Sequence, residues 1–243
     1  MRFNKLLIII FWGCCFISPA VSICQNIEKV YMPNIKTVQL FAYGNQQGLP
    51  VYTLNSSDRI ELDFDDMEGS VKSYYYTFVL CDYNWVPVNL SAFDYIKGFT
   101  QNRISTYRYS SIALTRYTHY QAILPDRNSV PTKSGNYLLK VFLDGDTSKL
   151  AFTRQMLVLD AKAAVTGEVV QPFSAQLFST HQKLRMSVNI SGINSFSAAQ
   201  QVKVVILQNN RWDNAQKGIP PTFVRGNVLD YNTENNSIFP AGK

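Results

Sequence analysis

The sequence predicts an all-β protein built from two consecutive β-sandwich domains, and two observations support this prediction. The first is an alternation of apolar and polar residues, which is strict over 59–65 and again over 184–190. Such alternation places the apolar side chains on one face of a strand and the polar ones in water. The second is the set of Gly, Asn, Asp and Ser residues that separates these runs at short intervals. Many short strands joined by turns indicate a sandwich.

Further strand-like runs follow one another along the chain and are rich in β-branched or aromatic residues. They are 37–43, 74–81, 117–124, 136–143, 152–159, 165–170 and 202–207. Asp144-Gly145 lies between two of these runs and predicts a hairpin turn. The run 74–81 is apolar on both faces, which is typical of a strand that is buried on both sides. Helical periodicity is weak, with at most a short helical turn around 91–97.

The two domains are expected to be immunoglobulin- or fibronectin-like. We place the boundary near 160–164, where one strand-like run ends and small residues lead into the next. The first domain, 23–160, would be a sandwich of about seven strands. The second, 161–243, is shorter and has no convincing final strand, so we expect it to be incomplete and the chain to be the N-terminal part of a longer protein.

Residues 1–22 have the pattern of a secretory signal peptide. Arg2 and Lys5 precede an apolar stretch, and Ala20-Val21-Ser22 supplies small residues at the positions that a signal peptidase reads. The apolar stretch is too short for a transmembrane helix. The sequence therefore predicts an exported protein.

Removal of this leader leaves two cysteines, Cys24 and Cys81. An exported compartment permits a disulfide between them, and the sequence leaves open whether they pair. Ile23 stands where a lipid-attachment signal requires a small residue, so we do not expect Cys24 to carry a lipid. Two cysteines are too few for a disulfide scaffold, and a hydrophobic core must stabilise the fold.

The chain is basic, with a net charge of +6 at pH 7, but its Lys and Arg residues are dispersed. No basic run is present of the kind that binds nucleic acid, and an exported protein rarely meets nucleic acid. We therefore expect no nucleic-acid partner.

Catalytic signals are weak. His119 and His181 are the only histidines, so metal-ligand spacing is absent, and there is no Gly-x-Ser-x-Gly turn. Asp63 and Asp65 lack the spacing of a calcium loop and occupy outward positions of a predicted strand. We expect His119 to be a hydrogen-bonded structural residue. The prediction is a protein without catalytic residues, metal, cofactor or small-molecule substrate, and therefore not an enzyme.

Large aromatic residues also occur in the loop-like region 82–108, where burial in a core explains them less easily. Trp, Tyr and Arg dominate the residues that contribute most to protein interfaces. Together with nearby cationic residues, these rings are candidate partner-binding residues: Trp85, Tyr95, Lys97, Phe99 and Arg103. Aromatic rings could equally stack on sugars, so an exported carbohydrate-binding β-sandwich module is the alternative. Packing in the core remains the better interpretation for any single ring.

Several phrases between about 35 and 159 form a distinctive ordered set. They are Thr37-Val38-Gln39-Leu40, Leu54-Asn55-Ser56, Leu62-Asp63-Phe64-Asp65-Asp66, Cys81-Asp82-Tyr83-Asn84-Trp85, Phe93-Asp94-Tyr95-Ile96-Lys97-Gly98-Phe99, Tyr117-Thr118-His119-Tyr120, Ser134-Gly135-Asn136-Tyr137 and Thr153-Arg154. In this order they resemble the plug protein family of the type IX secretion system of Bacteroidota. Leu80 departs from the pattern, because the family tends to have a histidine before the cysteine, and no role of that histidine is transferred.

The resemblance implies a non-enzymatic periplasmic protein at the inner face of the outer membrane. Its partner would be the large outer-membrane translocon barrel, whose periplasmic opening it would close when no cargo is present. We expect the 82–108 region to contribute to the docking surface. Replacing Trp85 or Tyr95 with alanine should then weaken docking while leaving the fold intact, whereas unfolding of both variants would assign the two rings to the core.

Overall fold

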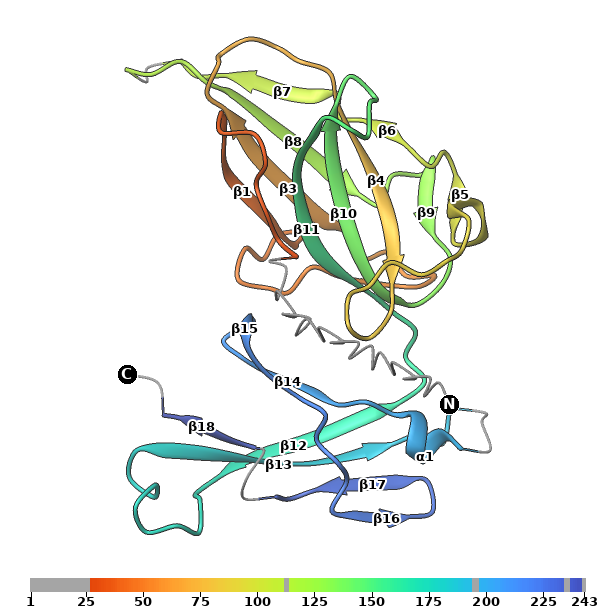
Figure 1. Cartoon of the computed structure of the whole chain (residues 1–243), viewed down its shortest axis with the longest axis vertical. Coiled ribbons are helices and arrows are strands. Elements are labelled where there is room, and N and C mark those ends of the chain that lie inside the picture. Colours follow the sequence, from red (N-terminus) through yellow and green to blue (C-terminus); the bar gives the residue numbers. More distant parts are fainter. Residues whose placement is uncertain (1–26, 112–113, 194–196, 234–236, 242–243) are drawn as a thin grey trace, which may run out of the picture.

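The computed structural model describes residues 27–111, 114–193, 197–233 and 237–241, so the predicted leader and Cys24 lie outside the described residues. The described chain forms two β-sandwich bodies, one above the other in Figure 1. The first ends with β11 (Leu150–Leu159) and the second begins with β12 (Ala164–Val170). The predicted all-β sandwich fold is confirmed.

Two facing sheets build the first domain. One has the spatial order β1 (Ile35–Ala42), β3 (Ile60–Asp66), β8 (Thr118–Leu124) and β7 (Thr106–Tyr109). The other has the order β2 (Val51–Thr53), β11, β10 (Gly135–Leu143), β4 (Tyr74–Cys81) and β6 (Asn102–Arg103). Beside them lie the short 3₁₀ helix η1 (Ala92–Asp94) and a strand pair, β5 (Ile96–Gly98) and β9 (Ser129–Pro131).

These sheets contain more strands than the seven predicted, because strands of two to four residues leave no measurable alternation in the sequence. The long strands follow the predicted pattern. Ile60, Leu62 and Phe64 on β3 are fully buried, while the residues between them face outward. At the predicted hairpin turn, Asp144 and Gly145 both have positive φ (57° and 72°), which matches the turn favoured by right-twisted strands.

An aromatic cluster joins the two sheets. Phe64 on β3 stacks on Tyr120 of β8, with ring centroids 5.0 Å apart. The same ring meets Tyr74 of β4 and Phe152 of β11 edge to face, at 5.1 and 5.0 Å. Edge-to-face and offset-stacked pairs are the favoured aromatic geometries, each contributing about 0.5–1.5 kcal/mol beyond the burial of area. The rings of Tyr74, Tyr76 and Phe78 on β4 are buried between the sheets, as predicted, whereas Tyr75 on the opposite face is only half-buried.

The second domain has two sheets of unequal size. The larger has the order β12, β13 (His181–Asn189), β17 (Val228–Tyr231) and β16 (Phe223–Arg225), and β18 (Ile238–Pro240) also pairs with β13. The smaller is the hairpin of β14 (Val205–Gln208) and β15 (Arg211–Lys217), preceded by the short helix α1 (Ala198–Gln201). The expectation of no final strand is wrong, because β18 provides one.

The small hairpin covers only part of the apolar face of the larger sheet. Val188 and Leu229 are buried on that face, whereas their lateral neighbours Val165 on β12 and Val224 on β16 are 64% and 53% exposed. The core of the second domain therefore lies under β13 and β17 and leaves both flanking strands open to solvent.

Candidate functional site

The region 82–108 begins with a turn that Asp82 organises. The Asp82 carboxylate accepts hydrogen bonds from the backbone N–H groups of Asn84 (2.8 Å) and Val86 (2.9 Å). The turn holds Trp85 at a φ of +65°, a left-handed conformation that is a genuine outlier for a bulky residue. This conformation carries the indole ring back onto the outer face of the sheet formed by β4 and β10, where Trp85 packs with Cys81 and Leu138.

Two of the candidate partner-binding residues, Trp85 and Tyr95, are buried, in agreement with the interpretation that any single ring packs in the core. Their exposed fractions are 4% and 5%. Tyr95 follows η1, its ring packs edge to face on Tyr137 at 5.9 Å, and its carbonyl accepts a hydrogen bond from the Thr132 N–H. Each ring is therefore an anchor that attaches an irregular segment to the sandwich, and neither is available for direct contact with a partner.

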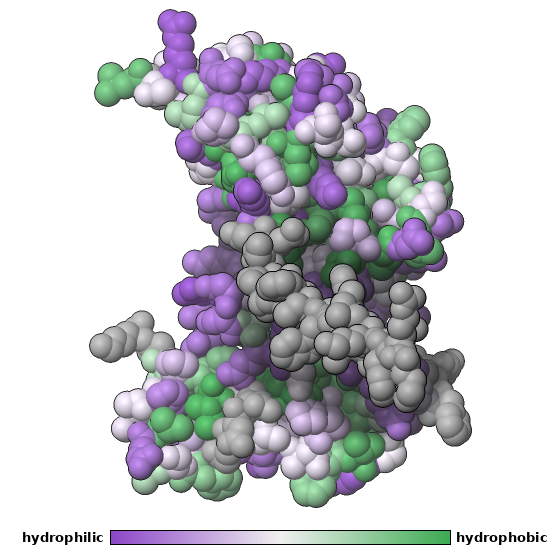
Figure 2. Space-filling view, in the orientation of Figure 1, coloured by the Kyte–Doolittle hydropathy of each residue, from purple (hydrophilic) through white to green (hydrophobic). Residues whose placement is uncertain are grey.

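The other three candidate residues, Lys97, Phe99 and Arg103, are exposed. Phe99 is exposed by 66%, and sequence analysis missed three further exposed apolar residues in the same stretch, among which Phe93 is exposed by 77%. We call the set the 86–103 surface; it consists of Val86, Leu90, Phe93, Lys97, Phe99 and Arg103. In Figure 2 hydrophobic residues reach the surface on the right-hand side of the upper domain, over the region of β5. The surface combines apolar rings with two cationic side chains.

The pairing of β5 with β9 fixes the middle of this surface. Gly98 has a φ of +97°, and a Cβ atom at this position would lie 2.2 Å from the Asn128 carbonyl oxygen. That same carbonyl accepts a hydrogen bond from the Phe99 N–H at 2.6 Å. The close approach of the two backbones therefore requires glycine and orients the chain on which Lys97 and Phe99 are presented.

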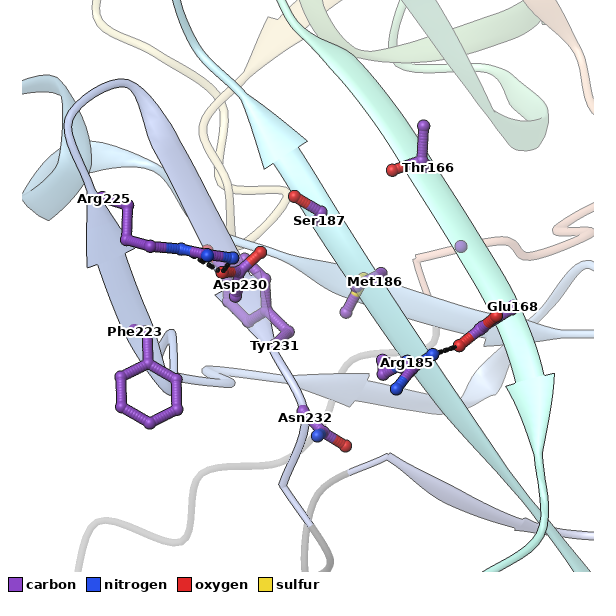
Figure 3. A pocket seen from close by; sticks show the side chains of 11 residues that line it. Thr166, Glu168, Arg185, Met186, Ser187, Phe223, Arg225, Asp230, Tyr231 and Asn232 are labelled. Carbon is purple, nitrogen blue, oxygen red and sulfur yellow. Dashed lines mark hydrogen bonds and ion pairs between the residues drawn. The ribbon is translucent and has the colours of Figure 1, made fainter.

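A polar groove of about 520 Å³ lies on the second domain. Figure 3 shows Glu168 and Arg185 paired on adjacent strands and Arg225 paired with Asp230, with the exposed ring of Phe223 below this second pair. Hydrogen bonds from Arg225 and then from Ser187 lower the pKa of Asp230. The charges of the groove are thus neutralised in pairs, and the groove presents no excess charge that would attract an ion.

The polar residues of β3 and β8 also have structural roles. His119 Nδ1 lies 2.8 Å from Asp65 Oδ1, as predicted for a hydrogen-bonded structural histidine. Asp63 and Asp65 point outward as predicted, but their side chains are only 15% and 17% exposed, so they are less solvated than expected. Within the described residues no group of His, Cys, Asp and Glu side chains has an arrangement that could hold a metal ion.

Cys81 is buried and has no disulfide partner within the described residues, and whether it pairs with Cys24, which lies outside them, stays open. Burial raises the pKa of the Cys81 thiol to about 11. The thiolate is the reactive form of cysteine, so Cys81 is a poor nucleophile in this state.

The two domains touch through a small set of contacts around Trp85. Its ring meets that of Trp212, on β15, edge to face at 5.0 Å. The backbone N–H of Gly218 donates to the Tyr83 hydroxyl at 3.2 Å, and the Asn210 side chain donates to the Gln47 carbonyl at 2.9 Å. The space left around the two tryptophans is only about 10 Å³, so the contact is closely packed. In Figure 1 the hairpin of β14 and β15 rises from the lower domain toward the upper one.

These observations define an all-β protein of two sandwich domains, with an exposed apolar and cationic surface on the first domain. No helix within the described ranges is long and apolar enough to cross a membrane. The chain belongs to the type 9 secretion system plug protein family, because the family model for the first domain of that protein matches residues 35–160, more than half of the chain. The family assigns it a role related to the plug of that secretion system.

A crystal structure of a hypothetical protein from Parabacteroides merdae is similar to both domains. It superimposes with a TM-score of 0.82 at 26% sequence identity over 89% of this chain. The match covers 54% of that protein, so the present chain spans about half of its length. A search of curated proteins returned no match.

Proposed function

We propose that this protein docks on the periplasmic opening of the type IX outer-membrane translocon and closes it when no cargo is present. Membership of the plug family is the observation that carries this proposal. On this proposal the protein is periplasmic, lies at the inner face of the outer membrane and acts by occupying the opening, without catalysing a reaction.

We infer that the 86–103 surface makes the contact. Four of its residues are apolar and more than 45% exposed, namely Val86, Leu90, Phe93 and Phe99. Interfaces gain most of their binding energy from a few such anchors, surrounded by polar and charged groups. A plug must leave when cargo arrives, so a small surface of moderate affinity suits it better than a large apolar interface. The cationic Lys97 and Arg103 would then favour acidic groups on the partner.

Binding to the purified translocon tests this proposal. The double variant Phe93→Ala/Phe99→Ala should bind at least about tenfold more weakly, because truncating an interface anchor commonly costs 2 kcal/mol or more. Tyr43→Ala/Tyr109→Ala is the matched control, since both rings are 62% exposed elsewhere on the same domain. Circular dichroism and thermal unfolding should show that both double variants remain folded.

Three results have different meanings. Weaker binding of the Phe93/Phe99 variant alone supports docking through the 86–103 surface. Equal binding of both variants keeps the plug proposal and rejects this surface. Failure of the unsubstituted chain to bind the translocon rejects the plug proposal itself.

A carbohydrate-binding module is the second candidate function. The observation in its favour is the groove in Figure 3, where the exposed ring of Phe223 lies beside paired charges that could hydrogen-bond sugar hydroxyls. Binding of soluble polysaccharides, measured in parallel with translocon binding, distinguishes the two candidates. Polysaccharide binding without translocon binding would favour the module.

A further inference from the structure

The strand β12 presents an unprotected edge. Its seven residues pair with β13 on one side, without a register shift, and have no partner strand on the other side within the described chain. Its first six residues are exposed, including Val165 and Val169, each at 64%. An exposed strand edge offers unpaired N–H and C=O groups to another strand.

The other edge strands of the described domains carry the features that discourage such pairing. A bulge lies between Lys36 and Gln39 on β1, and arginine occurs in each of β6, β7, β15 and β16. The remaining edges, β2, β5, β9, β14 and β18, have three or four residues. In contrast, β12 has seven residues and contains no Lys, Arg or Pro. Its one charge, on Glu168, is neutralised by Arg185 of the adjacent strand (Figure 3). Bulges, basic residues and short length are the usual means by which proteins block association through strand edges.

Gly167 lies at the middle of this edge, and the chain itself does not require glycine there. Its φ lies outside the left-handed region, and a Cβ atom would make ordinary contacts, the nearest at 3.5 Å to the Leu184 side chain. A glycine inside a strand weakens it, and often marks a place where another backbone approaches closely.

We propose that β12 is the interface of a homodimer, in which two copies pair antiparallel about a two-fold axis at Gly167. In this register Val165 of each copy lies opposite Val169 of the other, on the same face of the sheet. On the other face, Thr166 lies opposite Glu168. The pairing satisfies the free edge of both copies and joins their larger sheets into one.

The sequence of β12 favours this register over the two in which the axis moves by one residue, to Glu168 or to Thr166. An axis at Glu168 would bring two carboxylates directly opposite each other, which is destabilising. An axis at Thr166 would place Val165 opposite Gly167 and lose both valine pairs. Only the axis at Gly167 produces two cross-strand valine pairs and keeps the like charges apart, so the strand is complementary to itself as a two-fold interface requires.

Sedimentation equilibrium of the exported chain tests the dimer. The chain should associate reversibly between about 1 and 100 µM, as mass action requires for a dimer. Val165→Lys/Val169→Lys should weaken the dimer at least about tenfold, because lysine on an edge strand opposes pairing. Val224→Lys is the matched control, since Val224 is 53% exposed on the same face but at the opposite edge. A monomer throughout this range, or equal weakening by the control, overturns the proposal.

Cysteine cross-linking tests the register, in chains that carry Cys24→Ser so that the buried Cys81 is the one native thiol. Opposed Cα atoms in antiparallel strands are about 4.5–5.5 Å apart, within the range that a disulfide spans. Gly167→Cys should therefore form a covalent dimer under mild oxidation, whereas Thr166→Cys, which faces Glu168, should not. Equal cross-linking of the two variants, or none by Gly167→Cys, overturns the register about Gly167.

Discussion

Two aspartates on β3, three residues apart, have pKa values shifted in opposite directions. Asp66 is fully buried and accepts hydrogen bonds from Asn34 (2.7 Å) and Tyr74 (2.9 Å), with Lys72 at 3.0 Å. Burial acts to raise its pKa, but the hydrogen bonds from Asn34, from the backbone of Glu68, from Lys72 and from Tyr74 outweigh burial, and the pKa is lowered. The pKa of Asp63 is raised instead, first by burial and then by the charge of Glu61.

Replacing each aspartate by asparagine should therefore change stability in opposite directions at pH 7. Asp66→Asn should lower the free energy of unfolding by about 2 kcal/mol, because it removes the charge that Lys72 and Tyr74 solvate. Asp63→Asn should raise it by about 0.5 kcal/mol, since it removes repulsion from Glu61. Urea unfolding of the two variants and the unsubstituted chain measures both changes.

The pH dependence gives the control for this prediction. Asp66 has a lowered pKa in the folded state, so its stabilisation is complete above the unfolded pKa of about 3.9 and is lost as the pH falls through the folded pKa. Asp63 has a raised pKa, so its destabilisation is complete above the folded pKa and disappears below about 3.9. The difference in unfolding free energy between each variant and the unsubstituted chain should therefore shrink toward zero in acid. Differences that do not change with pH would contradict the roles assigned to the two carboxylates.

At the scale of elements, the pair β5–β9 depends on the close backbone contact at Gly98. Gly98→Ala should cost at least about 2 kcal/mol, because the Cβ meets the Asn128 carbonyl and the backbone is left-handed. Gly44→Ala is the matched control, with a φ of +76° and no atom near the new Cβ, so it should cost only the backbone strain. Hydrogen exchange should show faster exchange at β9 in the first variant alone.

Strong alternation explains which elements could be predicted from the sequence. The strands β3 and β4 begin and end close to the predicted residues, because their buried faces repeat every second position. The candidate site could not be predicted in the same way. The conformation of Trp85 depends on hydrogen bonds to Asp82, and its burial depends on Trp212 in the other domain. Nothing within the 82–108 region identifies Trp212 as the partner, whereas the exposed Lys97, Phe99 and Arg103 needed no distant partner.

At the scale of the whole molecule, the contact between Trp85 and Trp212 joins the two domains. One superposition on the Parabacteroides merdae structure extends over 89% of the chain, more than either domain alone, so the arrangement recurs at 26% identity. The 86–103 surface and the edge of β12 are therefore presented in a fixed relation to each other.

Removing the indole of Trp212 should allow the two domains to move relative to each other without unfolding either of them. Trp212→Ala should increase the radius of gyration measured by X-ray scattering and accelerate proteolysis between β11 and β12, since few contacts other than this ring connect the domains. Phe223→Ala, which removes an exposed ring from the same domain, is the control. An unchanged radius and cleavage rate in Trp212→Ala would show that other contacts maintain the orientation.

The placement of the tryptophans has a consequence for spectroscopy. The sequence has three, and Trp12 belongs to the predicted leader, so residues 23–243 contain Trp85 and Trp212, which touch each other across the domain boundary. The tryptophan emission of residues 23–243 therefore originates at the boundary. A shift of that emission to longer wavelength will record the opening of the two domains as water reaches the rings, even while every strand remains paired.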